Sequence, residues 1–207
     1  MARTRDAERS GAARRATIVD SALVLFAQRG YKGTSIAAIA QAAGITQPGV
    51  LHHFRTKEAL LTEVLAERDR QAFTAVGIDR AYAGPAIVRA LEIVYDMVAH
   101  SRENRELTRL THLGTAGSND IPESALEWSR TRVRTFLTNL AGVVSKDIEA
   151  GHIRPDARPE ATASLIIGMI TGLEQQWLLD ESFDMLVAMR AFIDTMTRDL
   201  LIPTPRD

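Results

Sequence analysis

Residues 34–57, TSIAAIAQAAGITQPGVLHHFRTK, predict two short helices joined by a glycine turn. A side-chain oxygen of Thr34 or Ser35 can cap the first helix, and Gly44 ends it because glycine readily adopts a positive φ. Thr46 can cap the second helix, whose first turn contains Pro48. The spacing of the apolar residues places Ile36, Ile39, Ala40 and Ala43 on the buried face of the first helix, and Val50, Leu51 and Phe54 on that of the second.

Two short helices with a tight turn, here at about residues 35–54, are typical of a helix-turn-helix, whose second helix enters the major groove of DNA. The exposed side of that helix would carry Gln47, Gly49, His52 and His53. Gln47 can pair with adenine through two hydrogen bonds, and small residues let the backbone approach the base edges. An ordinary helical hairpin in a bundle core is the alternative that this pattern leaves open.

The charge distribution favours the DNA-binding alternative. Residues 1–57 contain nine Lys or Arg and three Asp or Glu, a formal charge of +6, whereas the other 150 residues contain 16 and 23, a charge of −7. A basic segment that coincides with a helix-turn-helix is the electrostatic pattern of a nucleic-acid-binding domain.

Residues 15–67 resemble the DNA-binding domain of the TetR family of bacterial transcriptional repressors. The similarity lies in AxxLFAQRGYKGTSIAAIAQAAGI at 22–45 and in GxxxxxVLxHFxxKEALL at 44–61. One position departs from the family, which usually has a tyrosine, and thereby a phosphate contact, where this chain has Leu51. Because leucine has no donor, we expect Leu51 to be a packing residue here.

The DNA contacts are expected at the turn before the helix-turn-helix, within it and just after it. The resemblance implies that Tyr31 and Lys32 touch the DNA backbone, although Tyr31 can equally be a packing residue. Lys57 opens the next helix, where a cation opposes the helix dipole, and this favours a bound phosphate there. The residues expected to reach bases or phosphates are Tyr31, Lys32, Thr34, Ser35, Thr46, Gln47, Pro48, Gly49, His52, His53 and Lys57.

The periodicity of the whole chain predicts an all-α fold of about nine helices. We expect a flexible basic arm at 1–11, a three-helix DNA-binding domain at 12–57, and a helical bundle for effector binding and dimerisation at 58–207. The arm can lie along DNA or remain a solvated tail. The later helices are expected at about 57–73, 85–101, 103–114, 124–150, 159–179 and 183–201, with a break at 77–85 and a loop at 114–122.

The last two helices are the predicted dimer interface. Residues 151–180 resemble the corresponding segment of many TetR-like regulators, in which these helices form a four-helix interface with their counterparts. Independently, the helix at 159–179 is apolar nearly all round, which requires burial on more than one side. The alternative is a monomeric core that absorbs both apolar stripes. The expected interface residues are Leu165, Gly168, Met169, Gly172, Met189, Phe192, Ile193 and Met196.

The same resemblance implies a cavity for a small effector, apolar or amphipathic, in the C-terminal domain. Methionine and tryptophan side chains adapt well to such ligands. The candidate lining residues, each of which can instead be ordinary core, are Met97, His100, Leu113, Trp128, Phe136, Met169 and Trp177.

Other functional classes find no support in the sequence. The chain has no cysteine, and no GxSxG, GxxxxGK[ST] or HExxH motif. The adjacent histidines His52 and His53 should point away from each other on a helix, so we expect no metal site there. We also expect no cofactor and no enzyme activity. No apolar run is long enough to span a membrane, and the N-terminal residues do not form a secretory signal, so we expect a cytoplasmic protein.

The sequence therefore predicts a dimeric repressor that a small-molecule effector releases from a pseudo-palindromic double-stranded DNA operator. A helical small-molecule-binding protein without specific DNA readout is one alternative. A TetR-like activator is the other, because no residue reports where the operator lies relative to the promoter.

Overall fold

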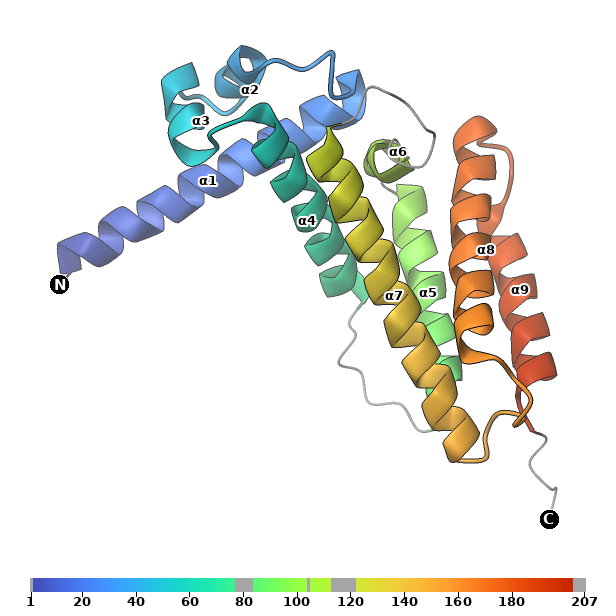
Figure 1. Ribbon diagram of the computed structural model, residues 1–207. Helices are drawn as coiled ribbons and strands as arrows, with labels where there is room; N and C mark the ends of the chain where they lie inside the picture. The colour runs from blue at the N-terminus through green and yellow to red at the C-terminus, as the bar shows by residue number, and fades with distance from the viewer. Residues whose placement is uncertain (1, 77–83, 104, 113–121, 203–207) are drawn as a thin grey trace. The chain divides into compact units, whose positions relative to one another are not determined.

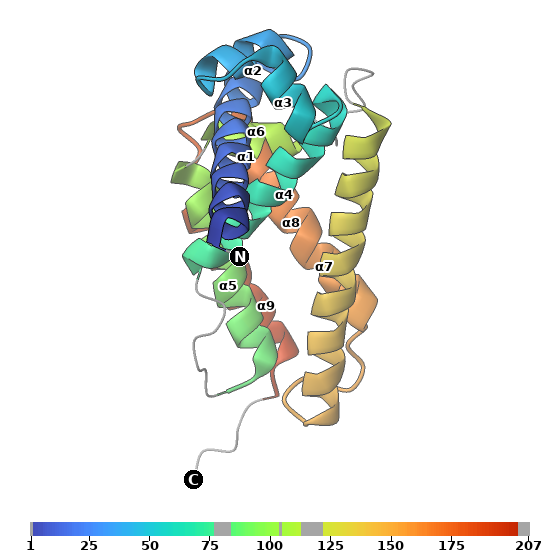
Figure 2. The same cartoon turned by 90° about the vertical axis from the view of Figure 1, so that its left-hand side faces the viewer.

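The computed structural model describes residues 2–76, 84–103, 105–112 and 122–202, and over these residues the chain forms nine α-helices (Figures 1 and 2). They are α1 (Ala2–Arg29), α2 (Ile36–Ala42), α3 (Gln47–His53), α4 (Lys57–Val76), α5 (Ala86–Glu103), α6 (Arg105–His112), α7 (Glu123–Glu149), α8 (Pro159–Leu179) and α9 (Met185–Leu200). Extended backbone in this part of the chain amounts to one isolated antiparallel bridge between Ile153 and Leu201. The all-α prediction is therefore confirmed.

The chain divides into two compact units, Met1–Gln71 with Glu106–Ser129 and Ala72–Arg105 with Arg130–Asp207. In the first unit, one face of α1 packs against α2, α3 and the first half of α4. The fully buried side chains of this core include Ile18, Phe26, Ile39, Val50, Leu60 and Val64. Because Leu60 and Val64 belong to it, the first unit extends beyond the domain boundary that we predicted at residue 57.

The second unit has its own core, built from α5, α8, α9 and the C-terminal part of α7. On α5, Ile87, Leu91, Val94 and Val98 are buried, and the fully buried residues of the unit include Leu91, Val98, Val144, Ile166 and Met185. The carboxylate of Asp147 on α7 accepts hydrogen bonds from the backbone N–H groups of Ala86 (3.1 Å) and Ile87 (2.7 Å). This buried side chain thus caps the N-terminus of α5 from another helix.

Several helix boundaries differ from the predictions by two or more residues, and the starts of α1 and α9 have a local reason. α1 begins at Ala2 rather than at Ala12, so residues 2–11 are helical instead of forming the expected arm. The reason is local: the segment is rich in Ala and Arg, lacks proline, and its single Gly11 lowers helix propensity without ending a helix. α9 begins at Met185 rather than at residue 183, because the side chain of Asp184 accepts from the N–H groups of Leu186 and Val187.

The connections expected at 77–85 and 114–122 lie almost wholly outside the described residues. Within the described residues, no helix is long and apolar enough to cross a bilayer.

Candidate nucleic-acid interface

The turn between α2 and α3 is fixed by hydrogen bonds at both helix ends. The Oγ of Ser35 accepts from the N–H of Ala38 (3.1 Å) and caps α2. At the other end, Gly44 donates to the carbonyl of Gln41 (3.2 Å) and Ile45 to that of Ala40 (3.0 Å). This pair of bonds is a Schellman motif, and Gly44 adopts the positive φ of 67° that the motif requires. The helix-turn-helix predicted from the sequence is therefore present.

The second helix of the motif, α3, buries one side and exposes the other. Thr46 caps it by accepting from the N–H of Gly49 (3.2 Å), and Val50 and Phe54 are buried in the core of the first unit. Of the residues predicted to meet bases or phosphates, Thr46, Gln47, Pro48 and His52 are exposed, whereas Gly49 and His53 are half-buried. α3 therefore presents a polar face around Gln47, as a recognition helix must.

The two histidines of α3 lie against each other rather than pointing apart. Their ring centroids are 5.5 Å apart and the rings meet edge to face at 76°. The prediction that adjacent positions separate their rings was wrong, because an imidazole is long enough to swing toward its neighbour.

Leu51 is not a packing residue. Its side chain is 38% exposed, while Val50 and Phe54 on either side of it fill the core. The prediction failed because a seven-residue helix turns only one narrow stripe toward the core of the first unit, and Leu51 lies outside that stripe. The resemblance to the TetR family already contained this information, since the family has a DNA-facing tyrosine at the position of Leu51.

The prediction that Thr34 contacts DNA was also wrong. Its hydroxyl is buried and donates to the carbonyls of Leu25 (3.0 Å) and Gly30 (2.9 Å), so it anchors the start of the motif to the end of α1. A side chain committed to the interior cannot reach a DNA phosphate. The turn before it is tight as well, because a Cβ on Gly33 would collide with the carbonyl oxygen of Arg29.

Lys57 joins the beginning of α4 to this turn. Its Nζ donates to the backbone carbonyl of Thr34 (2.7 Å) and lies 4.1 Å from the centroid of the Tyr31 ring. Burial lowers the pKa of the Lys57 ammonium, since desolvation disfavours its charge. Burial also raises the pKa of the Tyr31 phenol, with a smaller contribution from the negative charge of Glu58. Tyr31 packs on Phe26, with ring centroids 5.9 Å apart, which favours its packing role.

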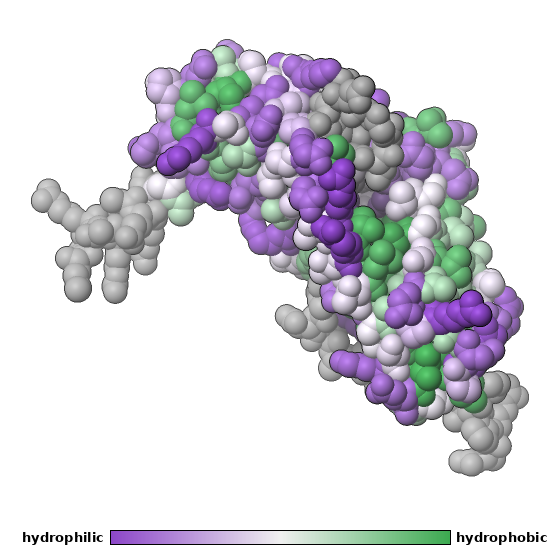
Figure 3. Space-filling view, viewed as in Figure 1, coloured by the Kyte–Doolittle hydropathy of each residue, from purple (hydrophilic) through white to green (hydrophobic). Residues whose placement is uncertain are grey.

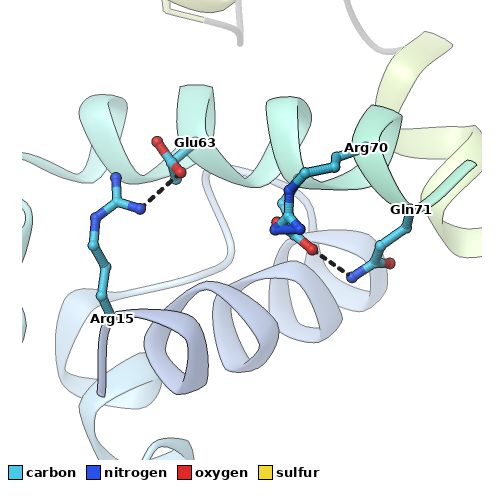
Figure 4. Close-up of polar contacts among 5 residues, drawn as sticks. Arg15, Glu63, Arg70 and Gln71 are labelled. Atoms are coloured by element: carbon cyan, nitrogen blue, oxygen red, sulfur yellow. Dashed lines mark hydrogen bonds and ion pairs between the residues drawn. The ribbon is translucent and has the colours of Figure 1, made fainter. Parts of the chain in front are cut away.

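An ion pair that the sequence did not reveal joins α1 to α4, and further polar contacts run along α4 (Figure 4). Arg15 on α1 donates to Glu63 on α4 (2.8 Å), and its guanidinium lies 4.8 Å from the centroid of the Phe54 ring. The hydrogen bond from Arg15 lowers the pKa of Glu63. Along α4, the carboxylate of Glu67 pairs with Arg70 and accepts from the amide of Gln71 (2.9 Å). Arg15 is one of the basic residues of the N-terminal segment, and its contact with Glu63 stabilises the packing of α1 against α4.

The predicted dimer residues separate into two groups. Leu165 and Gly168 are exposed, Met169 is just exposed and Gly172 is half-buried, all on α8. On α9, Met189 and Ile193 are buried in the core of the second unit, and Phe192 and Met196 are half-buried against that core. Met189 and Ile193 were therefore wrongly predicted as interface residues, because they face α5 and α8 of the same chain.

The predicted pocket residues do not form one group. Met97, His100 and Phe136 are half-buried and Trp177 is buried in the second unit, whereas Trp128 packs against the core of the first. Leu113 lies outside the described residues, and Met169 is on the exposed side of α8. Arg105 lies 5.9 Å from the centroid of the Trp177 ring, and it also donates to the carbonyl of Leu178 (2.9 Å). Sequence reasoning missed Glu174, which is buried one turn before Trp177.

Residues 18–64, which contain this motif, match the family model described as "Bacterial regulatory proteins, tetR family". The chain is 33% identical over 119 residues to the HTH-type transcriptional repressor KstR2 of Rhodococcus jostii (strain RHA1), a match that covers 49% of this chain and 58% of that protein. It is 27% identical over 203 residues to the HTH-type transcriptional regulator AcrR of Shigella flexneri, covering 92% and 91% of the two chains.

Solved structures share the fold over nearly the whole chain. A TetR transcriptional regulator from Chloroflexus aurantiacus J-10-FL superposes with a TM-score of 0.78 at 25% identity, over 94% of this chain and 100% of that one. The regulator FadR from Bacillus subtilis, solved in complex with stearoyl-CoA, gives a TM-score of 0.75 at 20% identity over 87% and 96%.

The capped helix-turn-helix and the exposed polar side of α3 define a DNA-binding transcriptional regulator of the helix-turn-helix class. Together with the family model and the full-length relatives, they place this chain in the TetR family of transcriptional regulators. That family is regulatory rather than enzymatic.

Proposed function

We propose that this protein is a dimeric repressor that reads a pseudo-palindromic operator and is released from it by a small-molecule effector. The observation that carries the proposal is the exposed polar face of α3, with Gln47 at its start and the capped turn behind it. Gln47 has the two-atom amide that pairs with the N6 and N7 of adenine. The proposed operator is cytoplasmic DNA, so the proposed place of action is the cytoplasm.

The outer side of α8 supports the dimer. Leu165 is 62% exposed and Leu179 is 80% exposed. Figure 3 shows apolar patches among polar residues on the half of the molecule that contains α8. A Cβ built on Gly168 or Gly172 would meet no atom within 4 Å, so packing within the chain does not require glycine there. Glycines spaced i, i+4 between exposed apolar residues allow a second helix to approach closely. We propose that a second copy of the chain covers this face of α8, and that it also covers the exposed Val187 on α9.

A dimer also suits the DNA. Two recognition helices related by twofold symmetry read two half-sites, and operator symmetry mirrors protein symmetry. In one conformation of the dimer, the two α3 helices do not fit the half-sites. An effector that binds this conformation more tightly shifts the population of dimers away from the DNA-bound state. FadR, which was solved with stearoyl-CoA, shows that a protein of this fold can hold a large amphipathic molecule. We propose an apolar or amphipathic effector of the C-terminal helices here as well.

The test compares the roles of Gln47 and Lys32 on two duplexes, one selected from a random pool with the full chain and one of scrambled sequence. Gln47→Ala should weaken binding to the selected duplex by about 1–3 kcal/mol and leave binding to the scrambled duplex unchanged. Lys32→Ala, the matched control for a backbone contact, should weaken both equally. Equal loss on both duplexes for Gln47→Ala would exclude base reading by this residue.

A further inference from the structure

Leu51 is an exposed leucine in the middle of the helix that faces DNA. Its side chain is 38% exposed, although the residues that α3 contributes to the core, Val50 and Phe54, are almost completely buried. Gln47 precedes it by four positions, which places the two side chains on the same side of the helix, one turn apart. Whatever surface Gln47 meets, Leu51 therefore meets as well.

The chemistry of the major groove limits what a leucine can contact there. Base edges in the groove present hydrogen-bond donors and acceptors, and the one apolar group among them is the C5 methyl of thymine. A leucine pressed against a polar edge removes water from it without returning a hydrogen bond, which is unfavourable. Against a methyl group, apolar surface is buried on both sides, which is favourable.

We propose that Leu51 is a specificity residue that reads the C5 methyl group of a thymine in each half-site of the operator. The proposal rests on the function proposed above, in which α3 enters the major groove. The Leu51 side chain has no donor, so it cannot hydrogen-bond a phosphate, and its 38% exposure sets it apart from the core residues Val50 and Phe54. The thymine lies close to the base pair that Gln47 reads, because one helical turn separates the two side chains by only about 6 Å.

The test removes the methyl group alone. In the selected duplex, each thymine is replaced in turn by deoxyuridine, which lacks the C5 methyl and keeps every hydrogen-bonding group. For the wild-type chain, we expect one replacement per half-site to weaken binding about three- to five-fold, the effect of one buried methyl group. For Leu51→Ala, the same replacement should change the affinity less than about 1.5-fold, because the partner of the methyl group is gone.

Val24→Ala is the matched control. Val24 is an exposed apolar residue of the first unit, on α1, and its variant should show the same deoxyuridine profile as the wild-type chain. Because the Leu51 side chain is exposed, Leu51→Ala should keep the thermal unfolding midpoint within a few degrees, so that lost binding does not report lost folding.

Two results would overturn the inference in distinguishable ways. If the selection enriches a motif but the deoxyuridine profile is the same for Leu51→Ala as for the wild-type chain, Leu51 reads no methyl group and the proposed repressor function stands. If the selection enriches no motif at all, both the inference and the proposed function fail.

Discussion

The ammonium group of Lys57 donates to the backbone carbonyl of Thr34 over 2.7 Å, which ties the first turn of α4 to the residue before the cap of α2. The same ammonium lies over the ring of Tyr31. One side chain thus links the helix-turn-helix to the helix that follows it. The sequence drew attention to Lys57 because a cation is unfavourable at a helix N-terminus, and this contact supplies an internal partner for it.

Lys57→Ala should therefore affect both folding and DNA binding. We expect the free energy of unfolding in urea to fall by roughly 1–2 kcal/mol, because a charged hydrogen bond is lost and a carbonyl is left without its partner. If Lys57 also contacts a phosphate, the slope of log affinity against log salt should become shallower by about 0.9. An unchanged slope together with lost stability would mean that Lys57 is a structural link only.

Gly44→Ala should destabilise the DNA-binding unit. Alanine at a φ of 67° is strained, and we expect a loss of about 1–2 kcal/mol in urea unfolding. Gly142→Ala is the control: Gly142 lies inside α7, a Cβ there meets open space, and the change should stabilise by up to about 1 kcal/mol. Equal effects of the two substitutions would contradict the assigned role of Gly44.

If α8 forms the proposed dimer surface, Leu165→Glu should shift the protein from a dimer to a monomer. An unpaired carboxylate buried on the α8 surface is incompatible with close approach of a second copy. Sedimentation at micromolar concentration measures the mass directly, and Val24→Glu, an exposed apolar residue of the other unit, should remain dimeric. A dimeric Leu165→Glu variant would place the interface elsewhere.

The pair between Arg15 and Glu63 should contribute a small, pH-dependent stability. Since the hydrogen bond from Arg15 lowers the pKa of Glu63 in the folded state, the contribution is present above the unfolded pKa of a glutamate and disappears as the pH falls through the folded value. Both side chains are partly exposed, so we expect only about 0.2–1 kcal/mol at neutral pH.

A double-mutant cycle checks this contribution. Glu63→Gln, Arg15→Gln and the double variant are unfolded in urea at neutral pH and at about pH 3. The coupling free energy should be measurable at neutral pH and fall as the pH is lowered through the pKa of Glu63 in the folded state. Coupling of the same size at both values would show that the charge of Glu63 is irrelevant.

The helix-turn-helix was predictable because its signals are local: the cap at Ser35, the positive φ of Gly44 and the apolar spacing of Ile39, Ala40 and Val50. The errors arose where tertiary packing decides. Thr34 was expected at the surface and is buried, whereas Leu51 was expected in the core and is exposed, since the packing of the whole unit determines which side chain faces inward. On α9, the periodicity could not distinguish burial of Met189 within the chain from burial against a partner. The predicted base contacts, dimer surface and effector lining remain predictions.

The proposed function requires that a symmetric pair of α3 helices reads a specific DNA sequence. The most direct test is selection from random duplexes with the purified full chain at a stated salt concentration, followed by sequencing. We expect an enriched inverted repeat whose half-site centres lie about one DNA turn, or a multiple of it, apart. A pool without any enriched motif, bound only weakly and in a salt-sensitive way, would contradict the proposed function.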